Sequence, residues 1–193
     1  LGLTIAEMEN VLAKAIVANG KLDLGALEMI FQETRQVIRK SRILEYFEAQ
    51  VPFAQVGGME EIKDWLHKRG DAFSARAREF GLPAPRGVLI LGVQGCGKSL
   101  VCKAISGLWK MPLLRLDMGA LFGGFNGQSE ENMRRALKTA ESVAPCVLWL
   151  DEIEKGLAGT QSSNFSDAGT TARVFSTFLT WLNDHTSDVF VIA

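Results

Sequence analysis

The sequence has no long apolar run, few cysteines and no excess of charge of either sign. No apolar stretch approaches the roughly 18–20 residues that cross a bilayer, and the first residues lack the charged start and small-residue cleavage site of a secretory signal. The three cysteines, Cys96, Cys102 and Cys146, are spaced neither as a metal knuckle nor as a disulfide framework. We therefore expect free thiols and a soluble protein in a reducing compartment.

The near balance of charge argues against a nucleic-acid partner. There are 21 basic and 22 acidic side chains, so the net charge of -1 gives no electrostatic footprint for following a polyanionic backbone. Apolar residues make up 47% and charged residues 22%, which is close to average soluble usage. A chain of 193 residues with this composition is long enough for one well-buried domain and a smaller companion.

Residues 1–50 predict a helical segment that precedes the main domain. Thr4 and Glu7 have the spacing of a capping box and begin an amphipathic pattern that runs to Ile16. A second such pattern begins near Asp23 and reaches Ile38, so the two predicted helices form a hairpin. Proline and glycine then interrupt the pattern, which places the boundary near residue 50, and two more helices are predicted over residues 59–68 and 72–80.

From residue 87 onward, short apolar runs alternate with longer helical patterns, which is typical of a parallel sheet with crossover helices. The runs predict strands over residues 88–91, 113–116, 146–150 and 189–192. The periodic stretches predict helices over residues 98–109, 129–141 and 170–183. Residues 156–169 are rich in Gly, Ser and Thr and predict a mobile loop.

A glycine-rich segment joins the first of these strands to the first of these helices. It reads Gly92-Val93-Gln94-Gly95-Cys96-Gly97-Lys98-Ser99 and fits the phosphate-binding pattern G-x-x-x-x-G-K-[ST]. The glycines let backbone N–H groups turn toward a β-phosphate at the positive end of the helix. Lys98 would neutralise the β- and γ-phosphates during catalysis, and Ser99 would offer its hydroxyl to Mg²⁺. The alternative is a glycine-rich turn with a surface lysine, which the strand-to-helix context disfavours.

Two carboxylates, Asp151 and Glu152, follow the apolar run over residues 146–150. A buried strand tolerates such groups at its carboxyl end, where open parallel sheets bind their ligands. Asp151 would hold a water of the magnesium shell, and Glu152 would polarise the attacking water as the general base. Such a pair taken alone is more often a solvated helix start, but the phosphate loop upstream favours the catalytic reading. ATP and Mg²⁺ are therefore the expected ligands of a P-loop NTPase.

These motifs, from Phe53 to Ala193, resemble the AAA ATPases. Residues 56–60, Val-Gly-Gly-Met-Glu, are similar to the segment whose backbone lies against adenine in that family, and residues 127–130 are similar to the G-x-S-E that opens its next helix. The resemblance implies a three-layer αβα fold, the family's large subdomain. It also implies that the nucleotide is held by Val56, Gly57, Val93, Gln94, Gly95, Cys96, Gly97, Lys98, Ser99 and Leu100.

In the AAA family, an aromatic residue two positions before the G-x-S-E glycine lines the pore of a hexameric ring and grips polypeptide. That position is Phe125 here, and Asn126 follows where an apolar residue is usual. The resemblance implies a homo-oligomeric ring that remodels a protein partner. Two alternatives stay open: Phe125 packs on its own domain, or the chain is a nucleotide-controlled scaffold with little hydrolysis.

Residues 95–99, 145–152 and 173–181 resemble, more narrowly, the AAA proteins encoded as a hypothetical chloroplast reading frame in algal plastids and by cyanobacteria. This likeness implies a place in the cyanobacterial cytoplasm or plastid stroma, and a role in photosynthetic or inorganic-carbon physiology. Residues 2–17 resemble the helical lid of a degenerate AAA-like domain that precedes the ATPase domain in that family. We expect the chain to begin within a longer protein and to end before that protein's sensor residue, arginine finger and helical lid. Without these groups, we expect the chain to hydrolyse ATP slowly by itself.

The remaining candidate side chains have ordinary structural explanations. The four tryptophans occupy positions expected to face the core, and the thiols of Cys102 and Cys146 are expected to pack there as well. His67 and His185 are isolated in the sequence and are expected to be solvated.

Overall fold

The computed structural model describes residues 9–10, 12–14, 16–17, 38, 43–47, 51–122, 128–154 and 165–193. At its centre is a five-stranded sheet with the order β1-β3-β4-β5-β2. The strands are β1 (Leu44–Phe47), β2 (Gly87–Val88), β3 (Leu113–Asp117), β4 (Cys146–Asp151) and β5 (Val189–Ile192). β2, β3, β4 and β5 pair in parallel, whereas β1 is antiparallel to β3. This is the α/β fold that the sequence predicts.

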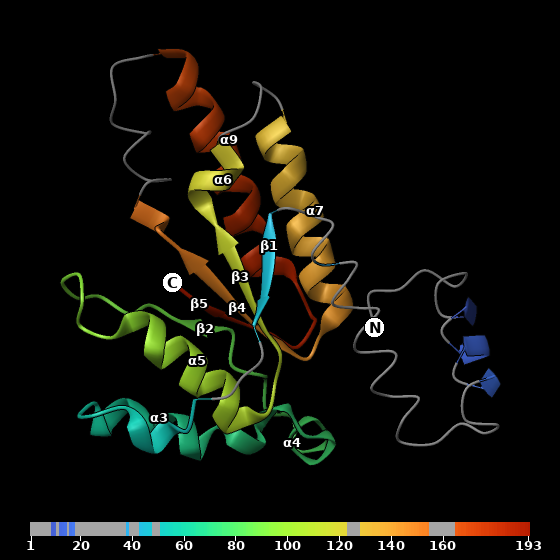
Figure 1. The fold of residues 1–193 in the computed structure, drawn as a ribbon, viewed down its shortest axis with the longest axis vertical. Coiled ribbons are helices and arrows are strands. Elements are labelled where there is room, and N and C mark those ends of the chain that lie inside the picture. Colours follow the sequence, from blue (N-terminus) through green and yellow to red (C-terminus); the bar gives the residue numbers. More distant parts are fainter. Residues whose placement is uncertain are drawn as a thin grey trace.

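The central strands are apolar on both sides because helices cover both faces of the sheet (Figure 1). One face packs against α6 (Met118–Phe122), α7 (Gln128–Val143) and α9 (Phe165–Asp184). The other face packs against α5 (Lys98–Trp109), with α3 (Glu60–Lys68) beyond it. Alternate residues of one strand therefore enter different cores: Leu113 joins the α5 side, whereas Leu114 and Leu116 join the α7 and α9 side.

Most predicted elements of residues 87–193 are confirmed. α5 and β5 have the predicted bounds, and β3, β4 and α7 extend the predicted ranges by one or two residues at an end. The β2 ladder continues past its assigned end, since the Ile90 N–H donates to the Ala193 carbonyl. The end of the predicted mobile loop is wrong, because α9 already begins at Phe165. Gly and Ser content is a weak guide to a helix start when tertiary packing can override it. The rest of that loop lies outside the described residues.

The region before the phosphate loop differs more from expectation. The helix predicted over residues 72–80 is two pieces, η2 (Gly70–Phe73) and α4 (Ala75–Glu79), because the Ser74 side chain accepts a hydrogen bond from the Ala77 N–H at 3.2 Å and caps a new helix. A further short 3₁₀ turn, η1 (Phe53–Gln55), precedes α3. Within the two helices predicted before residue 50, residues 9–10, 12–14, 16–17 and 38 are helical, and the other positions lie outside the described residues.

Two short elements were not predicted from the sequence. β1 covers the outer edge of β3, so the sheet begins at Leu44, before the boundary expected near residue 50. α6 follows β3 directly and begins where the Asp117 carboxylate accepts a hydrogen bond from the Ala120 N–H at 3.2 Å. β1 thus pairs along β3 from Leu113 to Leu116, and α6 continues the chain from the carboxyl end of β3.

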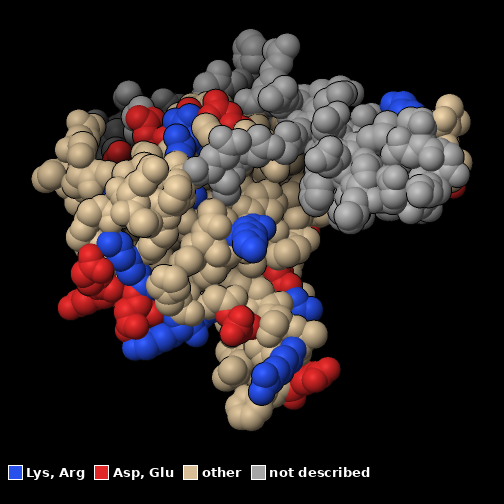
Figure 2. All heavy atoms as spheres, turned by 60° about the horizontal axis from the view of Figure 1, so that its bottom comes forward, with Lys and Arg blue, Asp and Glu red and all other residues tan. Residues whose placement is uncertain are grey.

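β1 and β2 are the two edge strands of the sheet, and no other described strand pairs with the outer side of either. Just beyond β2, Leu89, Leu91 and Val93 are 61%, 83% and 78% exposed. On the face drawn in Figure 2, the described basic and acidic side chains are interspersed rather than separated by sign. Among the described helices, none is long and apolar enough to cross a membrane.

Candidate nucleotide-binding site

The phosphate loop (residues 92–99) and the pair Asp151 and Glu152 lie at the same edge of the sheet. The loop follows β2, and the two acids follow β4. β2 runs parallel to β5, and β5 runs parallel to β4. The carboxyl ends of these three strands therefore lie along the same edge, which we call the carboxyl edge of the sheet. The fold therefore brings together two motifs that are more than 50 residues apart in sequence, at the edge where open parallel sheets bind ligands.

The backbone of the phosphate loop has the turns that a phosphate cradle needs. Gly95 and Gly97 have φ angles of 81° and 89°, in the left-handed region that side chains disfavour. Gly97 is the N-cap of α5 and supplies no side-chain cap, so first-turn N–H groups are left for a ligand. Together with the helix dipole, these N–H groups favour a bound anion.

Lys98, the first residue of α5, turns its ammonium group back over the loop. Its Nζ lies 2.7 Å from the Gly92 carbonyl oxygen and 2.8 Å from the Val93 carbonyl oxygen. The positive charge is thus held beside the loop by neutral acceptors. A phosphate oxygen carries more negative charge than a carbonyl and forms the stronger, charge-assisted contact. Ser99 and Leu100 follow on the exposed side of the first helical turn.

Only one of the three thiols is accessible. Cys96, in the loop, is exposed, whereas Cys102 and Cys146 are buried, so their predicted core packing is confirmed. Burial, and then the negative charge of Asp151, raise the pKa of Cys102 to about 12, and burial raises the pKa of Cys146 to about 12.

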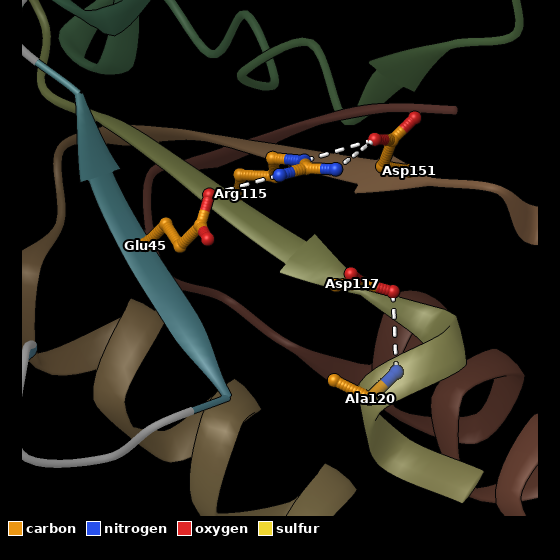
Figure 3. Close-up of polar contacts among 5 residues, drawn as sticks. All are labelled: Glu45, Arg115, Asp117, Ala120 and Asp151. Atoms are coloured by element: carbon orange, nitrogen blue, oxygen red, sulfur yellow. Dashed lines mark hydrogen bonds and ion pairs between the residues drawn. The ribbon is translucent and has the colours of Figure 1, made fainter. Parts of the chain in front are cut away.

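Asp151 is held by an arginine on the neighbouring strand. Arg115 Nε and Nη2 lie 2.9 and 2.5 Å from Asp151 Oδ2, and Arg115 Nη1 lies 2.9 Å from Glu45 Oε2 on β1 (Figure 3). Burial opposes the charge on Arg115, but hydrogen bonds and charge attraction from Asp151 and Glu45 raise its pKa. The guanidinium also lies over the Trp149 ring, 5.3 Å from the centroid. Three strands thus fix one carboxylate.

Glu152 is held differently from its neighbour. Its φ angle is 57°, a left-handed conformation that costs a residue with a side chain roughly 1–2 kcal/mol. A Cβ placed on Gly119 would lie 3.1 Å from Asp117 Oδ1 and 3.7 Å from Glu152 Oε2, so both carboxylates border the glycine at the start of α6. We call Asp117, Asp151 and Glu152 the acidic edge. Strain of this kind is often retained where it aims a functional side chain.

The donor set fits a magnesium ion bound together with phosphates. Ser99 offers a hydroxyl oxygen and Asp151 a carboxylate oxygen, and Mg²⁺ prefers oxygen ligands with few protein contacts and several waters. Both contacts of Arg115 go to Oδ2 of Asp151 and neither goes to Oδ1. Among the described residues, no group of three or more His, Cys, Asp or Glu side chains is arranged to hold a metal ion by itself.

The predicted adenine segment lies before α3. Val56 is buried against α5 and the sheet, whereas Gly57 is exposed. Gly58 and Met59 have φ angles of 68° and 60° and turn the chain into α3. Phe125 lies outside the described residues.

Sequence reasoning missed Arg115 and Glu45 and misplaced His185. A charged residue inside the apolar run Leu-Leu-Arg-Leu was a signal for Arg115, but its partners come from other strands. His185 is buried rather than solvated, stacks on Trp181 with a centroid distance of 4.3 Å, and leaves its Nε2 without a hydrogen-bond partner. Burial lowers the pKa of His185 from 6.5. His67 is exposed, as expected.

Comparison with known proteins identifies the family of this chain's relatives. The profile of the family described as "ATPase family associated with various cellular activities (AAA)" matches residues 88–193, and that of a "SpoVK-like AAA ATPase, second domain" matches residues 1–41. The "Uncharacterized AAA domain-containing protein ycf46" of Guillardia theta is 45% identical over 192 residues, covering 100% of this chain and 38% of the relative. Its counterpart in Gracilaria tenuistipitata var. liui is 46% identical over 192 residues, with the same coverage of 100% and 38%.

A more distant relative is the "Nuclear valosin-containing protein-like" of Mus musculus, 31% identical over 165 residues that cover 83% of this chain and 18% of the relative. The chain thus spans less than two fifths of the length of each of these relatives.

Proposed function

The chain belongs to the AAA ATPase family, and on that premise we propose that it binds ATP with Mg²⁺ at the phosphate loop and hydrolyses it with the acidic edge. The observation that carries this proposal is the loop itself. Two left-handed glycines turn its backbone into α5, and the Lys98 ammonium lies on its carbonyls. Charge of the right sign is therefore already placed for a polyphosphate.

Each side chain then has a defined task. Lys98 exchanges its carbonyl partners for phosphate oxygens, and the first-turn N–H groups of α5 bind the β-phosphate. Ser99 and Asp151 would hold Mg²⁺, which when bound offsets the charge that develops on the phosphates. Glu152 would accept the proton of the attacking water as the general base, so its oxygen must point toward that water. Its constrained backbone supports this task.

At the level of the whole protein, we assign the chain to a ring-forming ATPase that remodels a protein partner. The family assignment supports this, and Phe125 is the residue that would grip the polypeptide. Residues 1–41 would be the lid of a preceding AAA-like domain, as their match to a second AAA profile supports. The algal relatives support a plastid stroma or cyanobacterial cytoplasm as the location, with a role in photosynthesis or carbon uptake.

The exposed thiol of Cys96 provides a direct test of nucleotide binding. The other two thiols are buried, with pKa values raised to about 12, so a maleimide should label Cys96 alone. Saturating Mg²⁺-ATP should slow this labelling about tenfold or more, because phosphates would cover the loop. Equal labelling rates with and without Mg²⁺-ATP would contradict the proposal.

A matched control is Lys98→Ala, which leaves Cys96 and the loop backbone in place. Because it removes the ammonium that meets the phosphates, nucleotide protection should disappear. Lys98 Nζ also lies 3.9 Å from Cys96 Sγ, so protection is measured in each protein as the ratio of its labelling rates without and with nucleotide, and this ratio should fall to about one in Lys98→Ala. Sizing the protein with and without Mg²⁺-ATP then tests the ring. A monomer at all nucleotide concentrations would favour a nucleotide-controlled binding module over a ring.

A further inference from the structure

Arg115, a partly buried cation on β3, forms an ion pair with Asp151 of the acidic edge. Its side chain is 25% exposed and that of Asp151 is 26% exposed, so their ion pair is shielded from bulk water more than an ordinary surface pair. The contact runs diagonally across the sheet. Arg115 is paired in register with Trp149, and it reaches past that residue to the end of β4.

The geometry of this contact selects one oxygen of the carboxylate. Two guanidinium nitrogens, Nε and Nη2, converge on Asp151 Oδ2 at 2.9 and 2.5 Å. A carboxylate held at one oxygen by two donors cannot rotate freely about its Cβ–Cγ bond, so the direction of Oδ1 is fixed as well. The Trp149 ring lies against the guanidinium group and further restrains it.

Arg115 is itself held from the opposite side. Its Nη1 donates to Glu45 Oε2 at 2.9 Å, and Glu45 stands opposite Arg115 in the β1–β3 register. Glu45 is 58% exposed, so its contribution is the weaker of the two. The strand that bears it follows the segment over residues 1–41 that matches a separate AAA profile. Glu45 on β1 therefore contacts Arg115, which in turn holds Asp151, the candidate magnesium ligand.

From these contacts we propose that Arg115 is a positioning residue for magnesium. It would hold Asp151 at Oδ2 and leave Oδ1 for the metal's water shell, and Glu45 on β1 keeps Arg115 in place. This inference rests on the proposed function, because it concerns the metal that accompanies ATP. Partners that orient metal ligands commonly affect metal affinity about 10-fold to 100-fold, even though they never touch the ion.

The test measures how much Mg²⁺ is needed to bind a nucleotide. A fluorescent, non-hydrolysable ATP analogue is held at constant concentration, Mg²⁺ is titrated from an EDTA baseline, and anisotropy reports binding. In Arg115→Met, the Mg²⁺ concentration at half-saturation should rise about tenfold, since Asp151 loses its orientation. Analogue binding in EDTA should weaken by less than about threefold, because the phosphate loop is untouched.

Two further variants separate orientation from charge and from misfolding. Arg115→Lys keeps the charge but lacks the second donor of the fork, so its Mg²⁺ midpoint should lie between those of the unmodified chain and Arg115→Met. Glu45→Gln, at an exposed position, should fold normally and raise the midpoint by about twofold to threefold. Thermal denaturation of each variant checks that the fold is kept.

The outcomes are distinguishable. If the unmodified chain binds the analogue neither with nor without Mg²⁺, the proposed function fails. If it binds with a clear Mg²⁺ dependence but Glu45→Gln and Arg115→Met leave the midpoint unchanged, only the positioning role is wrong. A midpoint that falls in Arg115→Met would also overturn it, since Arg115 would then merely oppose the metal's charge.

Discussion

The phosphate loop and the acidic edge lie at the same edge of the sheet, but they hold their functional groups by different means. In the loop, the candidate phosphate-binding groups are backbone N–H groups and the Lys98 ammonium, and the other side chains are largely exposed. At the acidic edge, Asp151 is held by Arg115 from the neighbouring strand, and Arg115 is held in turn by Glu45 on a third strand. The first device is local in sequence and the second is assembled from several strands.

This difference predicts that single substitutions separate binding from hydrolysis. In Glu152→Gln, the side chain keeps its size and its backbone conformation but can no longer accept the proton of water. Steady-state hydrolysis should fall about 100-fold or more, while nucleotide protection of Cys96 stays within twofold. Phosphate release over time, measured beside the labelling rate, checks this. Undiminished hydrolysis would remove Glu152 from its assigned role.

The loop should fail through its backbone. Gly97→Ala places a Cβ at a φ angle of 89°, so it should destabilise the fold by about 1–2 kcal/mol and weaken Mg²⁺-ATP binding about tenfold. Denaturant unfolding and nucleotide titration measure the two effects. Gly57→Ala serves as the control: Gly57 is not among the positive-φ residues, a Cβ there meets nothing within 4 Å, and it should leave stability unchanged.

A pH effect on stability is expected from a residue outside both regions, His185. Burial lowers the pKa of His185 in the folded state, so the unfolded chain binds more protons near its ordinary value of 6.5. Stability is therefore full above about pH 6.5 and declines as the pH falls through that value. His185→Phe, which keeps an aromatic ring beside Trp181, should lose less of its Tm between pH 7.5 and 5.5 than the unmodified chain. An equal drop in both proteins would assign the pH response elsewhere.

The smallest effect on nucleotide binding is expected from a change of the Cys96 side chain. Cys96 is exposed and its backbone carries the loop, so Cys96→Ser should change Mg²⁺-ATP affinity by no more than about twofold. Because the variant cannot be labelled, a fluorescent nucleotide titration is the measurement. A tenfold loss would mean that the thiol itself contributes to binding, and the contrast between a backbone site and a side-chain site would be weaker than we describe.

The same contrast explains what the sequence could predict. The strand, the glycines and Lys98 are neighbours in the chain, so local pattern was sufficient to predict the loop and α5. Asp151 and Glu152 were found because they end a continuous buried run. Arg115 and Glu45 were missed because their partners are 36 and 70 residues away and meet only through strand register. β1 was missed since four residues are too few to show a periodic pattern.

The edge strand β2 has a consequence for any measurement of assembly. No strand of the described residues pairs with its outer side, and three exposed apolar side chains follow it, so this edge can pair with a strand from another copy of the chain. Association of that kind would grow with protein concentration and ignore nucleotide. Leu91→Lys should suppress association through the β2 edge. An oligomer of this variant that forms only with Mg²⁺-ATP can then be attributed to a ring.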